Sequence, residues 1–172
     1  MIYFVTPEWL KANTTINQNV DVADIVPLIK TSAQFKTQGY IGTYFFKDLL
    51  LKFNNQSLNA AEEILVQDYM KPAIAWRAAS EAVISTSYQI KNKGAQTQSG
   101  DFSVSPEFKA IMFLVHHYTD KADYYDNRLI EFLKLHREEY PEFMSKLNED
   151  AAILKHGCGT TPDGFTSNTL FI

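Results

Sequence analysis

One periodic stretch in the last third of the chain constrains its fold most strongly. Apolar and aromatic residues recur there at steps of four and three, which places them on one side of a helix. This stripe consists of Ile111, Val115, Tyr118, Ala122, Tyr125, Leu129, Phe132 and His136. It follows Ser105, Pro106 and Glu107, a helix-start signal of hydroxyl cap, proline and acid, and it stops before Pro141. A helix of about 33 residues spans roughly 50 Å and can serve as a spine for the others.

Two helices are expected in the first third of the chain. Asp21 or Asp24 can cap the first, and because proline is tolerated only in the first turn, Pro27 places its start near Asp24. We expect the residues before it to be irregular. The second helix follows a turn bracketed by Gly39 and Gly42. Its apolar face consists of Ile41, Phe45, Leu49 and Phe53.

A third helix should start at a capping box formed by Asn59 and Glu62 and continue to about Ser87. Pro72 lies inside it and lacks a backbone N–H, so we expect a kink or break near Lys71. Residues 92–105 show no periodicity, which indicates an exposed polar loop or a short hairpin. The sequence therefore predicts an all-α bundle of four to five helices. Its body is residues 1–150, and residues 151–172 form an extended C-terminal arm.

Composition and charge exclude several classes of protein. Sixteen basic and twenty acidic side chains give a net charge of -4, opposite in sign to a surface that binds phosphates, so sequence-specific DNA binding is not expected. The single cysteine, Cys158, cannot form an internal disulfide. Neither a signal peptide nor a membrane span is expected, because the longest apolar run has six residues, 110–115.

Few residues carry the pattern of a catalytic or metal site. His116, Asp120 and Asp123 share one helical face and could offer three metal ligands. The alternative is a solvated ridge, because Asp120, Asp123 and Asp126 are interleaved there with Lys121 and Arg128, as on an ordinary exposed face. The pair His156 and Cys158 has no visible third group to orient it. Neither a nucleophile elbow nor a phosphate-binding loop occurs, so we expect no enzyme, no metal and no cofactor.

Three consecutive aromatic residues, Tyr44, Phe45 and Phe46, cannot all face one interior. At least one of them should contact another chain, and we assign this contact to Phe46.

Five blocks of sequence resemble the head-tail connector (adaptor, or head-completion) proteins of tailed bacteriophages. The likeness is greatest to the version in phages of Bacteroidetes hosts, including the crAss-like phages. It covers about residues 3–144, in matching order and spacing. The blocks are "TPEWLKANTTINQNVD", "PLIKTSAQ" with "YIGTYFFKDL", "DYMKPAIAW" leading to "KNKG", "SPEFKAIM" with "DYYDNRLIEFL", and "YPEF".

The resemblance implies a virion protein of the phage neck, made in the host cytoplasm. Such a subunit assembles into a ring, of twelve copies in the expected form, which joins the portal to the tail. The ring continues the channel through which genomic DNA passes without sequence-specific binding, and a low positive charge suits that passage. The family has no catalytic residues to transfer. Expected partners are other copies of the chain, the portal and neighbouring neck or tail ring proteins, with no membrane.

The arm supplies most of the expected partner contacts. The arm is rich in glycine, serine and threonine, so it cannot bury enough apolar area to become ordered on its own. Its last three residues are nevertheless apolar. We expect Phe165, Leu170, Phe171 and Ile172 to dock on a partner. Lys91 and Lys93 would contact an acidic neighbour in preference to DNA. Three alternatives remain: a tail-completion or second-tier neck ring subunit, a helical binding module, and a metal-dependent hydrolase using His116, Asp120 and Asp123.

Overall fold

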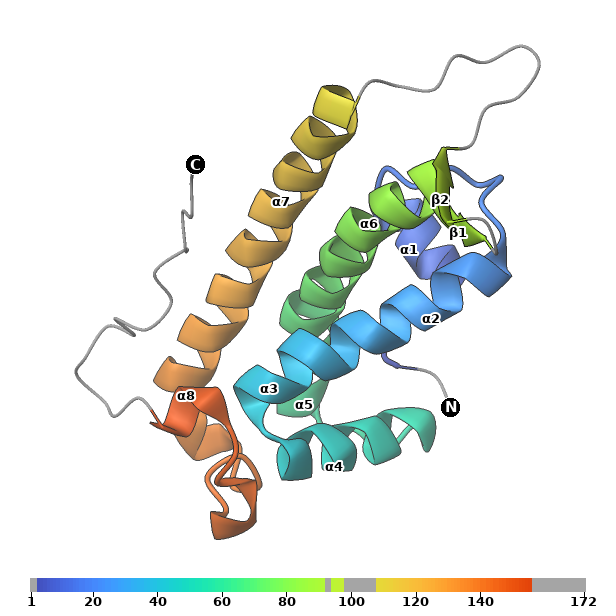
Figure 1. The fold of residues 1–172 in the computed structure, drawn as a ribbon. Helices are drawn as coiled ribbons and strands as arrows, with labels where there is room; N and C mark the ends of the chain where they lie inside the picture. The colour runs from blue at the N-terminus through green and yellow to red at the C-terminus, as the bar shows by residue number, and fades with distance from the viewer. Residues whose placement is uncertain (1–2, 92–93, 98–107, 156–172) are drawn as a thin grey trace.

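The computed structural model describes residues 3–91, 94–97 and 108–155. They form an α-helical bundle with a short β-hairpin (Figure 1), which confirms the expected all-α fold class. The helices are α1 (Pro7–Asn13), α2 (Val22–Ser32), α3 (Gln38–Ile41), α4 (Thr43–Asn54), α5 (Ala60–Ile64), α6 (Lys71–Ser87), α7 (Phe108–Leu135) and α8 (Ala152–Lys155). Two π-helical segments, Ala33–Thr37 and Leu65–Met70, join α2 to α3 and α5 to α6. Short 3-10 turns occupy Arg137–Glu139 and Lys146–Asn148.

Helix α6 is the centre of the bundle. It packs against α7 on one flank and against α2 on the other (Figure 1). Its buried surface is made largely of alanines, which allow close approach of the helix axes. These are Ala73, Ala75, Ala78, Ala79 and Ala82. A helix that is apolar around most of its circumference has to be enclosed by others, and α2 and α7 do this.

The aromatic residues of α4 form the second part of the core. Phe45 is fully buried, and its ring centroid lies 5.9 Å from that of Tyr140 and 5.7 Å from that of Phe143. Phe46 is 1% exposed and packs on Phe4, with centroids 5.5 Å apart. The assignment of Phe46 to a partner contact was therefore wrong, because the N-terminal segment covers that side of α4. Tyr44 is the exposed member of the trio.

The first two helices begin earlier than expected. The segment expected to be irregular contains α1, in which Thr6 accepts a hydrogen bond from the Trp9 N–H at 3.2 Å and Pro7 takes the first turn. Helix α2 is capped by Asp21, which leaves Pro27 inside the helix and not in its first turn. The proline is tolerated because it and Ala23, whose carbonyl loses its partner, both lie on the exposed side, where water can bind that carbonyl.

The interruption expected at Gly39 is absent, whereas the one expected near Lys71 takes the form of a π-helical segment, Leu65–Met70. Gly39 is helical in α3, so the turn into α4 occurs at Gly42 alone. Before Pro72 the chain forms a π-helical turn in which the Lys71 N–H donates to the Val66 carbonyl, five residues back. This wider turn carries the helix from α5 into α6 in place of a break.

The spine helix α7 has 28 residues and ends at Leu135, before the 3-10 turn and not at Pro141. Its start signal at Ser105–Glu107 lies outside the described residues. Of the expected stripe, Ile111, Ala122 and Leu129 are fully buried and the other members are half-buried. No helix in the described ranges has the length and apolar character needed to cross a bilayer.

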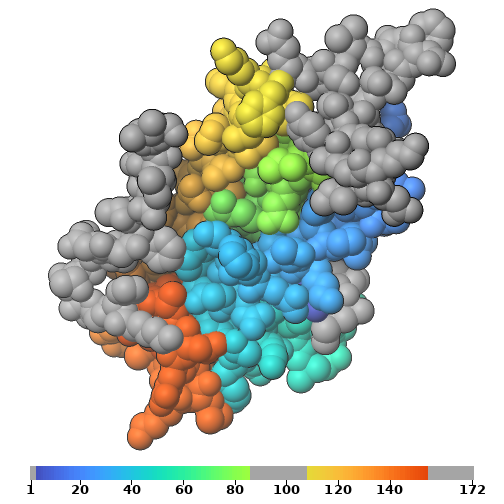
Figure 2. Space-filling view, viewed as in Figure 1, coloured from blue at the N-terminus to red at the C-terminus, as the bar shows by residue number. Residues whose placement is uncertain are grey.

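The polar segment and the C-terminal boundary of the body are placed as follows. β1 (Tyr88–Lys91) pairs with β2 (Gly94–Thr97) in antiparallel register, which confirms the hairpin alternative for this part of the segment; residues 92–93 and 98–105 lie outside the described ranges. Residues 151–155, assigned above to the arm, belong to the body, because Ala151 is fully buried and Ile153 is 7% exposed. Helix α8 packs on α3, and the preceding 3-10 turn Lys146–Asn148 packs on α4 (Figure 2).

Asn148 ties this C-terminal part of the body to the α3–α4 turn. Its amide donates to the carbonyls of Ile41 at 2.8 Å and Phe143 at 3.1 Å, and its Oδ1 accepts from the Phe45 N–H at 3.1 Å. Gly42 faces this amide with φ +88, and a Cβ there would lie 2.1 Å from Asn148 Oδ1. The turn therefore requires glycine for both its conformation and its space.

The two neighbouring glycines should respond to alanine in opposite ways. Gly42→Ala combines left-handed strain with loss of the Asn148 bonds, and we expect it to lower the free energy of unfolding by about 3–5 kcal/mol. Gly39→Ala meets no atom within 4 Å and lies in a helix, so it should raise that free energy by about 0.5–1 kcal/mol. Urea unfolding of both variants tests this, and similar midpoints for the two would contradict it.

Candidate functional site

The outward side of α7 is the most distinctive surface of the described chain. Phe113, Tyr124 and Leu135 follow one another at intervals of 11 residues and are 70%, 60% and 81% exposed. Eleven residues turn an α-helix three times plus about 20°, so the three side chains lie in line, about 16 Å apart. We call these three residues the α7 outer row. Three exposed apolar side chains on one side of a long helix would add apolar contact area to a chain that packed along it.

Stacked aromatic side chains lie beside the C-terminal half of the α7 outer row. The Phe132 ring stacks on Tyr69 with centroids 4.0 Å apart and on His136 with centroids 4.4 Å apart. The Arg128 guanidinium lies 5.3 Å from the Tyr69 centroid and 5.9 Å from that of Tyr124. Aromatic and arginine side chains are enriched in protein interfaces. This region is held together by contacts between α7 and the segment before α6.

A buried ion pair fixes α7 against α6. Arg77, on α6, lies 2.6 Å from Asp126 Oδ2 and 2.6 Å from Asp123 Oδ1. The two acids differ in environment, since the Asp126 side chain is 4% exposed and that of Asp123 is 57% exposed. Burial raises the pKa of Asp126 in spite of the attraction of Arg77. Burial and the nearby Asp126 raise the pKa of Tyr40 to about 12, so its phenol stays protonated at neutral pH.

This pair changes the interpretation of the acidic ridge on α7. Asp126 was expected on a solvated face and is instead a buried partner of Arg77. His116 and Asp120 are exposed, whereas Asp123 is held by Arg77. Among the described residues, none of the three belongs to a group of side chains that could hold a metal ion.

The described residues hold one group of possible metal ligands, and a lysine already occupies it. Oxygens of Asp48, Glu62 and Glu142 lie within 4.8 Å of one another. Lys52 Nζ lies 2.7 Å from Asp48, 2.6 Å from Glu62 and 3.6 Å from Glu142. Although burial opposes the charge, hydrogen bonds to Asp48 and Glu62 raise the pKa of Lys52 above its ordinary value. The ammonium therefore offsets part of the negative charge of the cluster and joins α4, α5 and the segment after α7.

The other expected partner residues are placed as follows. Phe165, Leu170, Phe171, Ile172 and Lys93 lie outside the described residues, as do His156 and Cys158. Lys91 ends β1, where only its backbone is described. The outer row was not recognised in the sequence, although its 11-residue spacing on a predicted helix was a usable signal.

A family model matches residues 37–153, which is about two thirds of the chain and includes α4, α6, α7 and the Asn148 turn. The family is described as DUF6712, a family of unknown function. The chain belongs to the DUF6712 family. No curated protein and no solved structure is significantly similar to it. In this DUF6712 chain the matched region begins at the last residue of the first π-helical segment, so it holds the outer row and the Arg77 pair but neither α1 nor α2.

Removing the Arg77 guanidinium and removing the charge of its exposed partner Asp123 should differ sharply in their effect on stability. Arg77→Met leaves Asp126 buried and unpaired, and we expect it to cost about 3–5 kcal/mol. Asp123→Asn, the matched control at the exposed partner, should cost no more than about 1 kcal/mol. Urea unfolding at neutral pH measures both, and equal losses would contradict the assignment.

The loss in Arg77→Met should also depend on pH. Without the guanidinium, the pKa of Asp126 rises further, so the folded state binds a proton at a pH where the unfolded state does not. Stability therefore increases as the pH falls from 7 toward the ordinary carboxyl range, and the deficit relative to the parent protein narrows. Unfolding curves at several pH values would show this, and a deficit that widens on acidification would contradict it.

Proposed function

We propose that this chain is a structural ring subunit of the neck of a tailed bacteriophage, joining the portal to the tail and continuing the DNA channel. It acts as a homo-oligomer, of twelve copies in the expected form, and not as an enzyme. It resides in the virion and contacts the portal and the neighbouring neck or tail rings. The matching sequence blocks support this proposal, and membership of a family of unknown function leaves it open to test.

The α7 outer row is the structural observation that supports the proposal most. Three large apolar side chains are exposed along about 33 Å of a straight element, with Arg128 and stacked rings beside them. Such a surface suits packing against another polypeptide better than it suits binding a small molecule, which calls for a concave pocket. On the opposite flank of α6, helix α2 exposes Val22 and Val26, 43% and 49% accessible. A head-to-tail ring requires two different interaction surfaces on each subunit, and the α7 outer row and the exposed valines of α2 would supply them.

A tail-completion or second-tier ring subunit would use the same two flanks, and the assembly experiments below distinguish it by which partner it binds. A hydrolase built on His116, Asp120 and Asp123 is the weaker candidate, because Asp123 Oδ1 is already 2.6 Å from Arg77.

Replacing the outer row should block assembly without unfolding the chain. In Phe113→Ser/Tyr124→Ser two exposed side chains are lost, so the unfolding midpoint should hardly move while the ring population, alone or with portal, falls at least about tenfold. Asn127→Ser, also exposed on α7 but rotated by about 60° from Tyr124, is the control. Native mass spectrometry and electron microscopy measure the assemblies. If the double variant formed normal rings, the outer row would not be part of the interface between subunits.

The C-terminal arm gives a second, separate test of the proposal. Deleting residues 165–172 removes Phe165, Leu170, Phe171 and Ile172, and we expect it to weaken co-assembly with portal or neighbouring ring proteins while the body keeps its stability. Pull-down with purified portal, compared with the full chain, measures this. Unchanged binding after the deletion would rule the arm out as a docking element.

A further inference from the structure

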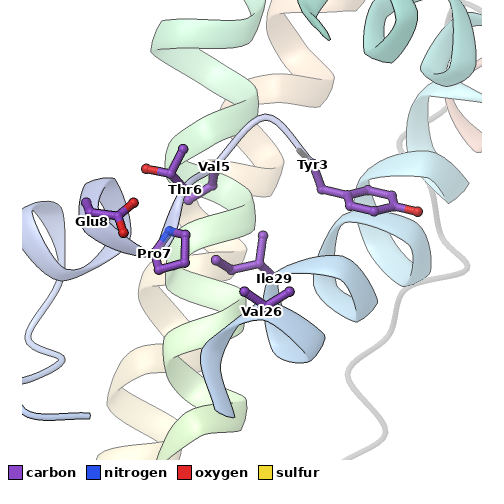
Figure 3. A pocket seen from close by; sticks show the side chains of 7 residues that line it. All are labelled: Tyr3, Val5, Thr6, Pro7, Glu8, Val26 and Ile29. Carbon is purple, nitrogen blue, oxygen red and sulfur yellow. The ribbon is translucent and has the colours of Figure 1, made fainter. Parts of the chain in front are cut away.

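An apolar groove lies between the N-terminal segment and α2, next to the α2 flank that exposes Val22 and Val26. Its volume is about 220 Å³. Val26 and Ile29 point from α2 toward Val5 and Pro7, while Tyr3 borders one end (Figure 3). The side chains that line it are mostly apolar, so it would favour an apolar occupant.

The wall opposite α2 is held rigidly. Phe4 is 1% exposed and lies in the left-handed region with φ 61, which costs a non-glycine residue free energy. Its ring is held 5.5 Å from Phe46 and 5.4 Å from Phe53, so the core holds the strained backbone in place. Val5, next in the chain, is 2% exposed. The groove is therefore formed before anything binds in it, which lowers the entropic cost of binding.

The groove has the size for one aromatic side chain. A cavity of about 150 Å³ is enough to bind benzene in another protein, and this one is larger. Val26 lines the groove and is 49% exposed, and Val22, one helical turn before it on α2, is 43% exposed, so the two valines offer apolar contacts to residues next to a bound ring. A short segment with a central phenylalanine between aliphatic residues would fit this arrangement.

The chain itself contains such a segment beyond the described body. Residues 170–172 are Leu-Phe-Ile, and they follow a stretch rich in glycine, serine and threonine. Helix α8, where the described body ends, packs on α3, which continues α2. Ile29 precedes Ile41, the end of α3, by twelve residues, or about 18 Å along the helix. A flexible linker of about 15 residues has a root-mean-square length of roughly 20 Å.

We propose that, in the free chain, Phe171 of the same molecule occupies this groove, with Leu170 and Ile172 against Val22 and Val26. The reach of the linker matches the span, which is the condition for a high effective concentration, on the order of millimolar. The C-terminal residues of a second copy at micromolar concentration compete poorly with this effective concentration. The contact would cover the exposed valines of α2.

This docking does not depend on the proposed function, but it has a consequence for it. The tip would cover the α2 flank that head-to-tail packing needs, so a ring could grow only after a partner displaced the tip. Free subunits would stay monomeric until the portal, or the first subunits on it, took up the apolar residues.

Disulfide trapping in the full chain tests the docking directly. In a Cys158→Ser background, which removes the single native cysteine, Val26→Cys is combined with Ile172→Cys. The matched control combines Ile172→Cys with Tyr124→Cys, a residue that is also exposed but lies on α7. We expect intramolecular cross-linking at least about tenfold faster for Val26→Cys than for the control and independent of protein concentration. Adding Phe171→Ser should reduce the rate to that of the control.

Three results would overturn the proposal: equal rates at the two sites, a rate unaffected by Phe171→Ser, or concentration-dependent disulfide dimers, which would assign the occupant to a second copy. Val22→Cys, one helical turn from Val26, repeats the experiment if Val26→Cys alters the unfolding midpoint. The trapping uses no portal, so its failure leaves the neck-ring proposal standing, and failure of ring assembly leaves the docking standing.

Discussion

The enclosure of α6 and the single guanidinium inside it determine much of the architecture. Alanines allow α2 and α7 to approach α6 closely, and this places Arg77 where only 9% of it remains exposed. A charge in such a place requires a partner, and Asp126 on α7 supplies it at 2.6 Å. The pair therefore selects the rotation of α7 about its own axis. Asp126 turned inward leaves Phe113, Tyr124 and Leu135 turned outward.

A second constraint acts at the opposite end of the bundle. Asn148 satisfies three backbone groups of the α3–α4 turn and of the segment after α7, and Gly42 makes room for it. Tyr140, 1% exposed, adds a hydrogen bond from its phenol to the Ala61 carbonyl at 3.0 Å. These contacts join the C-terminal part of the body to α4 and α5, which explains why residues 151–155 behave as body and not as arm.

Several features of the fold that depend on residues close together in the chain were predicted correctly from the sequence. The capping box at Asn59 and Glu62 is present as expected, and the three-and-four periodicity identified α7. The same cap, proline and acid pattern occurs at Thr6–Glu8, so α1 was predictable and was missed because the segment is short. Pro27 was given too much weight, since solvent can bind the carbonyl that loses its partner. At Pro72 the expected irregularity is present as the π-helical segment before it. Asp126 and Phe46 could not be placed from the sequence, because Arg77 and Phe4, which decide their burial, are distant in the chain.

The arrangement of the two exposed flanks bears on the kind of assembly that the body could form. If the α7 outer row paired with its own copy about a two-fold axis, a dimer would result and Val22 and Val26 would remain exposed. If the row of one copy packed on the α2 flank of the next, both apolar surfaces would be buried in each contact, and repetition would give a closed ring or an open filament. Since burial of apolar area drives association, the head-to-tail arrangement gains more free energy per subunit. Arg77 fixes one of these flanks and the strained Phe4 borders the other, so the geometry of such a contact would be set by the folded monomer and not by its partners.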